Sequence, residues 1–295
     1  MDLKSLASEF LNRTIKNSVE HTGMADSTRA NTISFLDNPK FAKDINKNLN
    51  ISVVLVREED APLLHEKIEA VIVEKPKAAL FGLHNEYCKQ YLKYGENKIA
   101  PSASIHPLAY IAPNGVTIGE NVVIAPNAVI LAGVEIGDNT TIGPNCVIGE
   151  DGFHVFEDLN KVKRIVCHDG FVKIGSNVDI QASVTVDKGF MGRDTVIGDE
   201  CKIDNFVHIA HRVHVGARTL FAGGTSVGGS TYIGNNVWIG SKCTISNRLT
   251  IGSNARVLIG AVVIRNLKEN DIVSGNFAMP HQKHLLESGR FLLES

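Results

Sequence analysis

An aliphatic residue recurs every six positions through most of the last two thirds of this 295-residue chain. The longest uninterrupted run covers residues 197–263, and shorter runs cover 118–148 and 174–186. Within each six-residue unit the second position is often Gly and the fifth is small or β-branched. A period of six with two inward-facing positions fits neither a helix nor the plain alternation of a long strand. It predicts short strands joined by corners, three to a coil of about 18 residues, which is a parallel β-helix.

The same repeat accounts for most of the cysteines. Cys146, Cys201 and Cys243 all occupy the small fifth position, so we expect them in the core of the solenoid. The chain has five cysteines and no C-x-x-C pair, which argues against a disulfide framework or a zinc ribbon and favours a reducing compartment.

Charge and hydropathy exclude several classes of protein. Thirty Lys and Arg against 32 Asp and Glu leave a net charge of −2, so a strongly basic nucleic-acid binder is not expected. No apolar run approaches the roughly 18 residues that a membrane span needs, and the N-terminus lacks the apolar stretch of a signal peptide. We therefore expect a cytoplasmic protein with no transmembrane segment.

The extent of the six-residue repeat divides the chain into three predicted regions. Residues 1–98 lack it and are predicted to form a small α/β domain, with helices over 3–11 and 77–91 and strands over 53–56 and 70–73. Residues 99–275 form the solenoid, and residues 276–295 are predicted to form a short C-terminal helical tail. The predicted fold class is mainly β: a parallel β-helix with a small N-terminal α/β domain and a short C-terminal helix.

Two insertions interrupt the repeat. About 20 residues separate Ile148 from the unit that opens at Ile174, and five more lie between Val186 and Ile197. Insertions in a solenoid project as loops from one face, often the binding face. A tolerated surface excursion is the alternative interpretation, above all for the shorter one.

One histidine and one glycine are spaced by a single coil. Gly229 follows His211 by 18 residues, so the two should stack about 4.8 Å apart. An imidazole beside an accessible backbone N–H suits acyl transfer, in which one group takes a proton and the other donates to an oxyanion. An ordinary surface histidine is the alternative. His208, His211 and His214 point in different directions in such a coil, so a metal site within one chain is not expected.

Several motifs resemble the UDP-3-O-acyl-glucosamine N-acyltransferases, which add the amide-linked acyl chain during lipid A synthesis. The stretch 203–211 (IDNFVHIAH), the Gly-rich segment 222–230, the loop 150–153 (EDGF), 187–189 (DKG) and 194–198 (DTVIG) match that family. In the first domain, 33–41 (ISFLDNPKF) resembles its uridine-binding strand and turn. The resemblance implies a left-handed winding of the β-helix and a homotrimer whose active sites lie between neighbouring chains.

The resemblance also implies a role for individual residues. His211 would be the general base that deprotonates the glucosamine 2-amino group, and the Gly229 N–H would stabilise the oxyanion. Phe35 would stack on uracil, Asn38 would hydrogen-bond the nucleotide, and Asn205 would lie near the sugar. No cofactor is implied, because the acyl group arrives on the phosphopantetheine of acyl carrier protein or coenzyme A.

Three further positions deserve separate expectations. Phe41 stands where the family has Tyr, and Arg248 stands where it has a second histidine, so we expect Arg248 to pair with a phosphate. Lys188 is expected one coil below His211, where its charge would keep the imidazole neutral.

The leading hypothesis is N-acyl transfer from an acyl carrier protein to a UDP-linked 3-O-acyl-glucosamine. The short C-terminal tail favours an alternative, in which a short acyl group moves from coenzyme A to a nucleotide-linked amino sugar of a surface glycan. Two further hypotheses remain. The third is a solenoid that only binds or scaffolds and whose active site has decayed, and the fourth is a trimeric metal enzyme.

Overall fold

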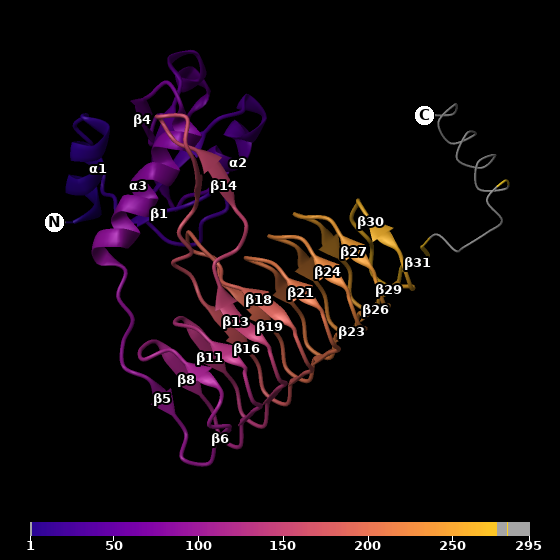
Figure 1. Ribbon diagram of the computed structural model, residues 1–295. Coiled ribbons are helices and arrows are strands. Elements are labelled where there is room, and N and C mark those ends of the chain that lie inside the picture. Colours follow the sequence, from indigo (N-terminus) through magenta and orange to yellow (C-terminus); the bar gives the residue numbers. More distant parts are fainter. Residues whose placement is uncertain (1, 276–281, 283–295) are drawn as a thin grey trace.

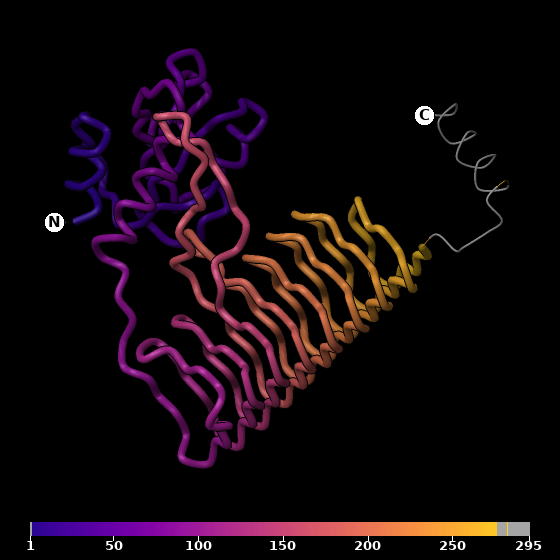
Figure 2. The backbone as a smooth tube through the Cα atoms, in the orientation of Figure 1, coloured from indigo at the N-terminus to yellow at the C-terminus, as the bar shows by residue number. Residues whose placement is uncertain are grey.

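The computed structural model describes residues 2–275 and 282 (Figure 1). A long stack of β-coils carries a small globular unit on one side, and the backbone trace shows the coils following one another in register (Figure 2). The predicted helical tail over 276–295 falls outside the described residues apart from residue 282. Among the described residues, none of the helices combines the length and the apolar character that a bilayer crossing requires.

The N-terminal unit is a four-stranded parallel sheet covered by helices. Its elements are α1 (Leu3–Leu11), β1 (His21–Thr22), β2 (Thr32–Leu36), η1 (Pro39–Phe41), α2 (Ala42–Lys47), β3 (Ile51–Val56), η2 (Glu58–Leu63), β4 (Glu69–Ile72) and α3 (Pro76–Tyr91). The strand order is β1-β2-β3-β4. Asp2 caps α1 by accepting a hydrogen bond from the Ser5 N–H, and Pro76 opens α3 at a position that needs no N–H. The predicted helices and strands of this unit are confirmed, whereas β1, α2 and the two short 3-10 helices were not predicted.

Three parallel sheets form the sides of the solenoid, in agreement with the predicted parallel β-helix. One sheet contains β5 (Lys98–Ile99), β8 (Val116–Ile118), β11 (Val134–Ile136), β16 (Val172–Ile174), β19 (Thr195–Ile197), β22 (His214–Val215), β25 (Tyr232–Ile233) and β28 (Thr250–Ile251). The second contains β7 (Tyr110–Ile111), β10 (Val129–Ile130), β13 (Val147–Glu150), β18 (Thr185–Asp187), β21 (His208–Ile209), β24 (Ser226–Val227), β27 (Thr244–Ile245) and β30 (Val262–Val263). The third contains β6 (Ser104–Ile105), β9 (Val123–Ile124), β12 (Thr141–Ile142), β17 (Asp179–Ile180), β20 (Lys202–Ile203), β23 (Leu220–Phe221), β26 (Trp238–Ile239), β29 (Arg256–Val257) and β31 (Ile272–Val273).

Strand register confirms the predicted coil length and both insertions. Ile209 pairs with Val227, an offset of 18 residues. The offset rises to 38 residues where Ile136 pairs with Ile174, and to 23 where Ile180 pairs with Ile203. The aliphatic first positions and the small fifth positions, including Cys146, Cys201 and Cys243, fill one continuous buried core.

The corners of the coils explain two sequence preferences. The fourth position of many units adopts a left-handed backbone, as at Asn121 with φ 55° and Asn236 with φ 56°, and Asn tolerates this conformation better than most residues. The second-position glycine is required for close approach: a β-carbon on Gly216 would lie 2.6 Å from the carbonyl carbon of Gly234 in the next coil.

Both insertions attach the N-terminal unit to the solenoid. The first forms the antiparallel hairpin β14 (Val155–Glu157) and β15 (Lys163–Ile165), which rises from the coils to α3 (Figure 1). Phe156 of the hairpin and Phe190 of the second insertion are buried in one apolar cluster with Phe81 of α3. The insertions are therefore packed structural elements, and the interpretation as tolerated surface excursions is wrong.

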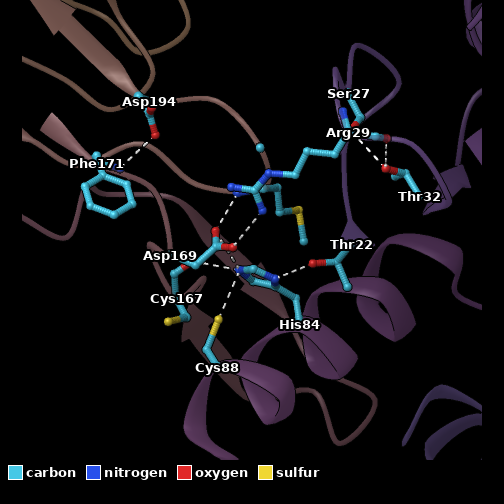
Figure 3. Close-up of polar contacts among 12 residues, drawn as sticks. Thr22, Ser27, Arg29, Thr32, His84, Cys88, Cys167, Asp169, Phe171 and Asp194 are labelled. Atoms are coloured by element: carbon cyan, nitrogen blue, oxygen red, sulfur yellow. Dashed lines mark hydrogen bonds and ion pairs between the residues drawn. The ribbon is translucent and has the colours of Figure 1, made fainter. Parts of the chain in front are cut away.

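A polar network lies beside this apolar junction (Figure 3). The fully buried His84 of α3 donates from Nε2 to the Cys167 carbonyl at 3.0 Å and accepts at Nδ1 from the Thr22 hydroxyl at 2.6 Å. Asp169 lies 3.6 Å from both the His84 ring and the Arg29 guanidinium. The network ties α3, the N-terminal loop and the end of the hairpin insertion together.

Candidate active site

His211 and Gly229 stack as their spacing predicts. His211 occupies the corner after β21, and the Ser230 N–H donates to its carbonyl at 2.9 Å across the coil spacing. A β-carbon added to Gly229 would lie 2.5 Å from Cε1 and 2.6 Å from Nε2 of the His211 ring. The imidazole therefore fills the space that a side chain at position 229 would need.

The hairpin insertion covers the other side of the same ring. A β-carbon on Gly152 would lie 2.7 Å from Cδ2 of His211. The imidazole is thus held between two glycines, one from the next coil and one from the insertion. Neither position tolerates a side chain without moving the ring.

The surroundings of His211 hold its imidazole neutral. Burial first, and then the nearby His168, His154, Arg212 and Arg248, lower the pKa of His211 to about 3. The ring centres of His154 and His168 lie 5.4 Å and 5.5 Å from that of His211. A neutral imidazole is the form that accepts a proton.

We expected the His211 imidazole to be neutral, but because of the charge of Lys188 and not because of burial. The register Thr185↔His208 puts Lys188 one coil below His211, as the spacing predicts. The Lys188 ammonium, however, lies 3.1 Å from the Asp151 carboxylate. It is absent from the causes of the lowered His211 pKa, in which desolvation comes first.

A cavity of about 480 Å³ opens beside His211 and Gly229. It is lined by Asp151, Phe153, His154, Asp187, His208, Ala210, His211, Arg212, Gly229, Ser230, Asn247 and Arg248. Burial and the neighbouring Glu150 and Asp151 raise the pKa of Asp187 to about 7. The cavity therefore presents a neutral imidazole, a backbone amide and a carboxyl group that titrates near neutral pH.

A second cavity, of about 570 Å³, lies between the N-terminal unit and the solenoid. Phe35, Asn38 and Phe41 line it, as does Phe81, whose ring meets that of Phe35 edge-on with centres 5.6 Å apart. Its wall shares four residues with the first cavity: His154, Arg212, Ser230 and Arg248. The two cavities therefore adjoin.

Cationic side chains concentrate where the cavities meet. Lys77, Arg193, Arg212 and Arg248 all line the second cavity. Asp26 from the N-terminal unit lies 2.8 Å from the buried Arg212 and 3.2 Å from Arg193. This arrangement can accommodate a dianionic group between an aromatic pocket and the imidazole.

The structure brings most of the predicted residues together, but Asn205 and Lys188 line neither cavity. His211, Gly229 and Arg248 line the first cavity, and Phe35, Asn38 and Phe41 line the second. Asn205 lines neither cavity; its Oδ1 accepts a hydrogen bond from the Ala182 N–H at 2.9 Å, in the previous coil. The expected place of Asn205 near the sugar stays a prediction.

Sequence reasoning missed His154, His168, Arg193 and Arg212. His154 and His168 belong to the long insertion and Arg193 to the short one, where no repeat indicates direction. Arg212 follows His211 directly and adopts a left-handed backbone with φ 59°, at a corner position that Asn fills elsewhere. An arginine at such a position is a signal that could have been used.

Residues 115–150 and 194–229 match the family model described as bacterial transferase hexapeptide (six repeats). The chain carries the hexapeptide repeat of bacterial transferases. This repeat agrees with the expected left-handed form of the parallel β-helix.

Named relatives match a shorter stretch. UDP-3-O-acylglucosamine N-acyltransferase of Rickettsia conorii is 42% identical over 89 residues, which are 30% of this chain and 22% of that protein. The enzyme of the same name from Rickettsia felis is 40% identical over 89 residues, with the same coverage. The chain thus spans about a fifth of the length of the curated relatives it matches, and the predicted resemblance is confirmed over that stretch.

Solved structures of sugar-nucleotide acyltransferases are also similar. UDP-N-acetylglucosamine O-acyltransferase of Moraxella catarrhalis is 26% identical, with 65% of this chain and 76% of that chain covered and a TM-score of 0.40. UDP-N-acetylglucosamine acyltransferase of Campylobacter jejuni is 20% identical, with 66% and 83% covered and a TM-score of 0.45.

Proposed function

We propose that this protein is an N-acyltransferase that moves an acyl group from a phosphopantetheine thioester to the 2-amino group of a UDP-linked 3-O-acyl-glucosamine in lipid A synthesis. The observation that carries the proposal is the His211 imidazole lying against the Gly229 backbone, inside a cavity that adjoins an aromatic, cation-rich pocket. The relatives named for this reaction support the choice of substrate.

The Gly229 amide is suited to bind an oxyanion. At the equivalent corner position of other six-residue units the backbone N–H is used: Ala217, two coil sides earlier, donates to Asn235 Oδ1 at 2.9 Å, and Asn235, one side later, donates to Ser253 Oγ at 3.1 Å. Within the part of the chain that the structure describes, the Gly229 N–H donates to no protein group, whereas its neighbours Gly228 and Ser230 both donate across the coils. A free N–H beside the base is the donor that a tetrahedral intermediate needs.

The chemistry then follows from these groups. The substrate amine attacks the thioester carbonyl, and the new C–N bond forms as the carbonyl oxygen becomes an oxyanion held by the Gly229 N–H. Nε2 of neutral His211 accepts the proton that the amine loses. The C–S bond breaks as the carbonyl re-forms, and the thiolate of the phosphopantetheine takes the proton back from His211.

The adjoining cavity supports a nucleotide as the handle of the substrate. Phe35 and Phe41 offer apolar faces for a base, and base–aromatic stacking contributes about 1–3 kcal/mol. Arg248 and Arg212 lie between these rings and His211, where the diphosphate of a UDP-sugar would pass. The protein would act in the cytoplasm as a homotrimer, with acyl carrier protein or coenzyme A as the acyl carrier.

The test is an acylation assay with UDP-3-O-acyl-glucosamine and thioesters of acyl carrier protein and of coenzyme A, with the amide product identified by mass spectrometry. We expect His211→Ala to lower kcat more than a hundredfold, since a positioned base contributes about 10²–10⁴, and to leave UDP binding unchanged. Phe35→Ala should instead raise the Kd for UDP roughly tenfold. No amide product with either carrier, or normal turnover by the His211 variant, would overturn the proposal.

A further inference from the structure

His168, near the end of the long insertion, has one ring nitrogen in use and one without a partner. Its side chain is fully buried, and Nδ1 lies 2.8 Å from the Val166 carbonyl oxygen. A carbonyl only accepts hydrogen bonds, so Nδ1 carries the proton and Nε2 of the neutral ring carries the lone pair. Burial lowers the pKa of His168, which favours this neutral form. Nε2 is itself buried and has no hydrogen-bond partner among the residues that the structure describes.

His211 also has one ring nitrogen without a partner, and in its case that nitrogen carries a proton. Its Nδ1 is buried and, within residues 2–275, has no hydrogen-bond partner. Its Nε2 is the nitrogen that acts as base in the proposed function. A base at Nε2 requires the proton of the neutral ring to be on Nδ1. The buried Nδ1–H of His211 therefore needs an acceptor, and the buried Nε2 of His168 needs a donor.

The two rings are close enough for a hydrogen bond between these two nitrogens. Their centres are 5.5 Å apart, with an angle of 66° between the planes. A ring nitrogen lies about 1.2 Å from the ring centre, so nitrogens turned toward each other at this separation are about 3.1 Å apart, within hydrogen-bond range. The rings are not turned into that alignment in the structure, as neither nitrogen has a partner, and catalytic hydrogen bonds often tighten only on substrate binding.

We propose that His168 is a positioning residue for the general base: its Nε2 accepts a hydrogen bond from Nδ1–H of His211. The resulting chain runs from the His211 Nδ1–H to His168 Nε2, and from the His168 Nδ1–H to the Val166 carbonyl. It fixes the His211 tautomer whose Nε2 lone pair faces the substrate amine. The role of Nε2 as a base rests on the proposed function, whereas the tautomer does not.

His154 is the competing acceptor, and the structure favours His168 over it. The His154 ring centre is 5.4 Å from that of His211, and its Nε2 is also buried without a partner. In the described part of the chain, however, no hydrogen bond to the His154 ring fixes its tautomer, and the ring lines both cavities, where a ligand can supply a partner. Among the described residues these imidazoles are also not arranged to hold a metal ion with a third ligand.

The experiment measures the His211 tautomer directly. Two-bond proton–nitrogen correlation spectra of the full chain with ¹⁵N-labelled histidine separate the two neutral forms, and His211→Gln assigns the signals. We expect the Nδ1–H form in the wild-type protein, and a substantial population of the Nε2–H form in His168→Leu. His168→Gln places an amide oxygen near the position of Nε2, so it should keep the Nδ1–H form.

Kinetics provide the second measurement. His168→Leu should lower kcat roughly tenfold to a hundredfold with little change in KM for the UDP-sugar, and His168→Gln should recover most of that loss. An Nε2–H form in the wild-type protein, or a tautomer that changes in His154→Leu and not in His168→Leu, would overturn the proposal. If His168→Leu does not fold, His168→Met replaces it, because a thioether sulfur is a much weaker hydrogen-bond acceptor than an imidazole nitrogen. If the wild-type protein has no acyltransferase activity, the proposed function fails while the spectra still decide the tautomer.

Discussion

Gly229→Ala tests whether the close stacking of His211 against the next coil is what aligns the base. The added methyl group would lie 2.5 Å from Cε1, whereas ordinary contact begins near 3.4 Å, so the ring must move by about 1 Å. It cannot move directly away, because Gly152 lies against its other side, where a β-carbon would be 2.7 Å from Cδ2. The imidazole must therefore tilt, which moves Nε2 relative to the Gly229 N–H.

A displacement of this size costs about a hundredfold in rate when it misaligns reacting groups. We expect kcat of Gly229→Ala to fall roughly a hundredfold while the Kd for UDP stays within about twofold, because the aromatic pocket is unchanged. Overpacking of this kind destabilises by about 1–3 kcal/mol, so thermal unfolding should show a folded protein with a modestly lower Tm. Steady-state kinetics, UDP titration and calorimetry measure the three quantities.

Gly223→Ala is the matched control. Gly223 has the same place in its six-residue unit as Gly229, but the nearest atom to its added β-carbon is the Asp204 carboxylate oxygen, 3.1 Å away at the end of a side chain. Gly223→Ala should keep turnover within about threefold of the wild type. Near-normal turnover by a folded Gly229→Ala would show that ring position does not limit the reaction.

Three further perturbations test the charges of the site and of the domain junction. Asp187 has a pKa raised to about 7 in the folded state, so the folded state retains a proton between about pH 4 and 7 that the unfolded chain releases, and its contribution to stability falls as pH rises. Asp187→Asn should therefore gain stability relative to the wild type between pH 5 and pH 8 in urea unfolding, and a constant difference would contradict the shift. Arg248 lies where both cavities meet, so Arg248→Gln should raise the Kd for UDP roughly tenfold or more. The control is Arg256→Gln on the outer face of β29, which should leave the Kd unchanged. Equal effects of the two substitutions would show that Arg248 does not belong to the site. Asp169→Ala should lower the free energy of unfolding by about 2–3 kcal/mol, because the Asp169 carboxylate is 10% exposed and pairs with two groups across the junction. Asp179 belongs to a half-exposed ion pair, so Asp179→Ala should lower it by less than about 1 kcal/mol. Thermal unfolding measures both changes.

The repeat made the solenoid predictable to single residues. Because each coil has a fixed length, the spacing of His211 and Gly229 specified a contact between residues distant in sequence, and the structure places the two together. The same rule predicted that Cys146, Cys201 and Cys243 lie in the core of the solenoid, and it predicted the size of both insertions. Local periodicity determines all of these features, so no knowledge of distant packing was needed.

The walls of the site could not be obtained in this way. His154 and His168 lie on the long insertion, whose path depends on burying Phe156 against α3 of the N-terminal unit. That packing is a contact between segments with no common period, and the sequence pattern carries no information about its direction. The lowered pKa of His211 depends on this same enclosure, which is why a lysine one coil away was the expected cause and burial is the actual one.

A bare coil would leave His211 at a solvent-exposed corner with a pKa near that of a free imidazole. The insertion encloses the ring and keeps it neutral, but enclosure also weakens a base, since a pKa near 3 gives little driving force for accepting a proton. The proton becomes easier to accept once the developing oxyanion lies beside the Gly229 N–H, because a negative charge next to the imidazolium raises its pKa. The low pKa of the free protein and the action of His211 as a base are therefore compatible only when substrate is bound. Accordingly, kcat/KM should not decline through the titration of an ordinary histidine as pH falls from 8 to 6, and a decline with an apparent pKa near 6.5 that His211→Gln abolishes would contradict this account.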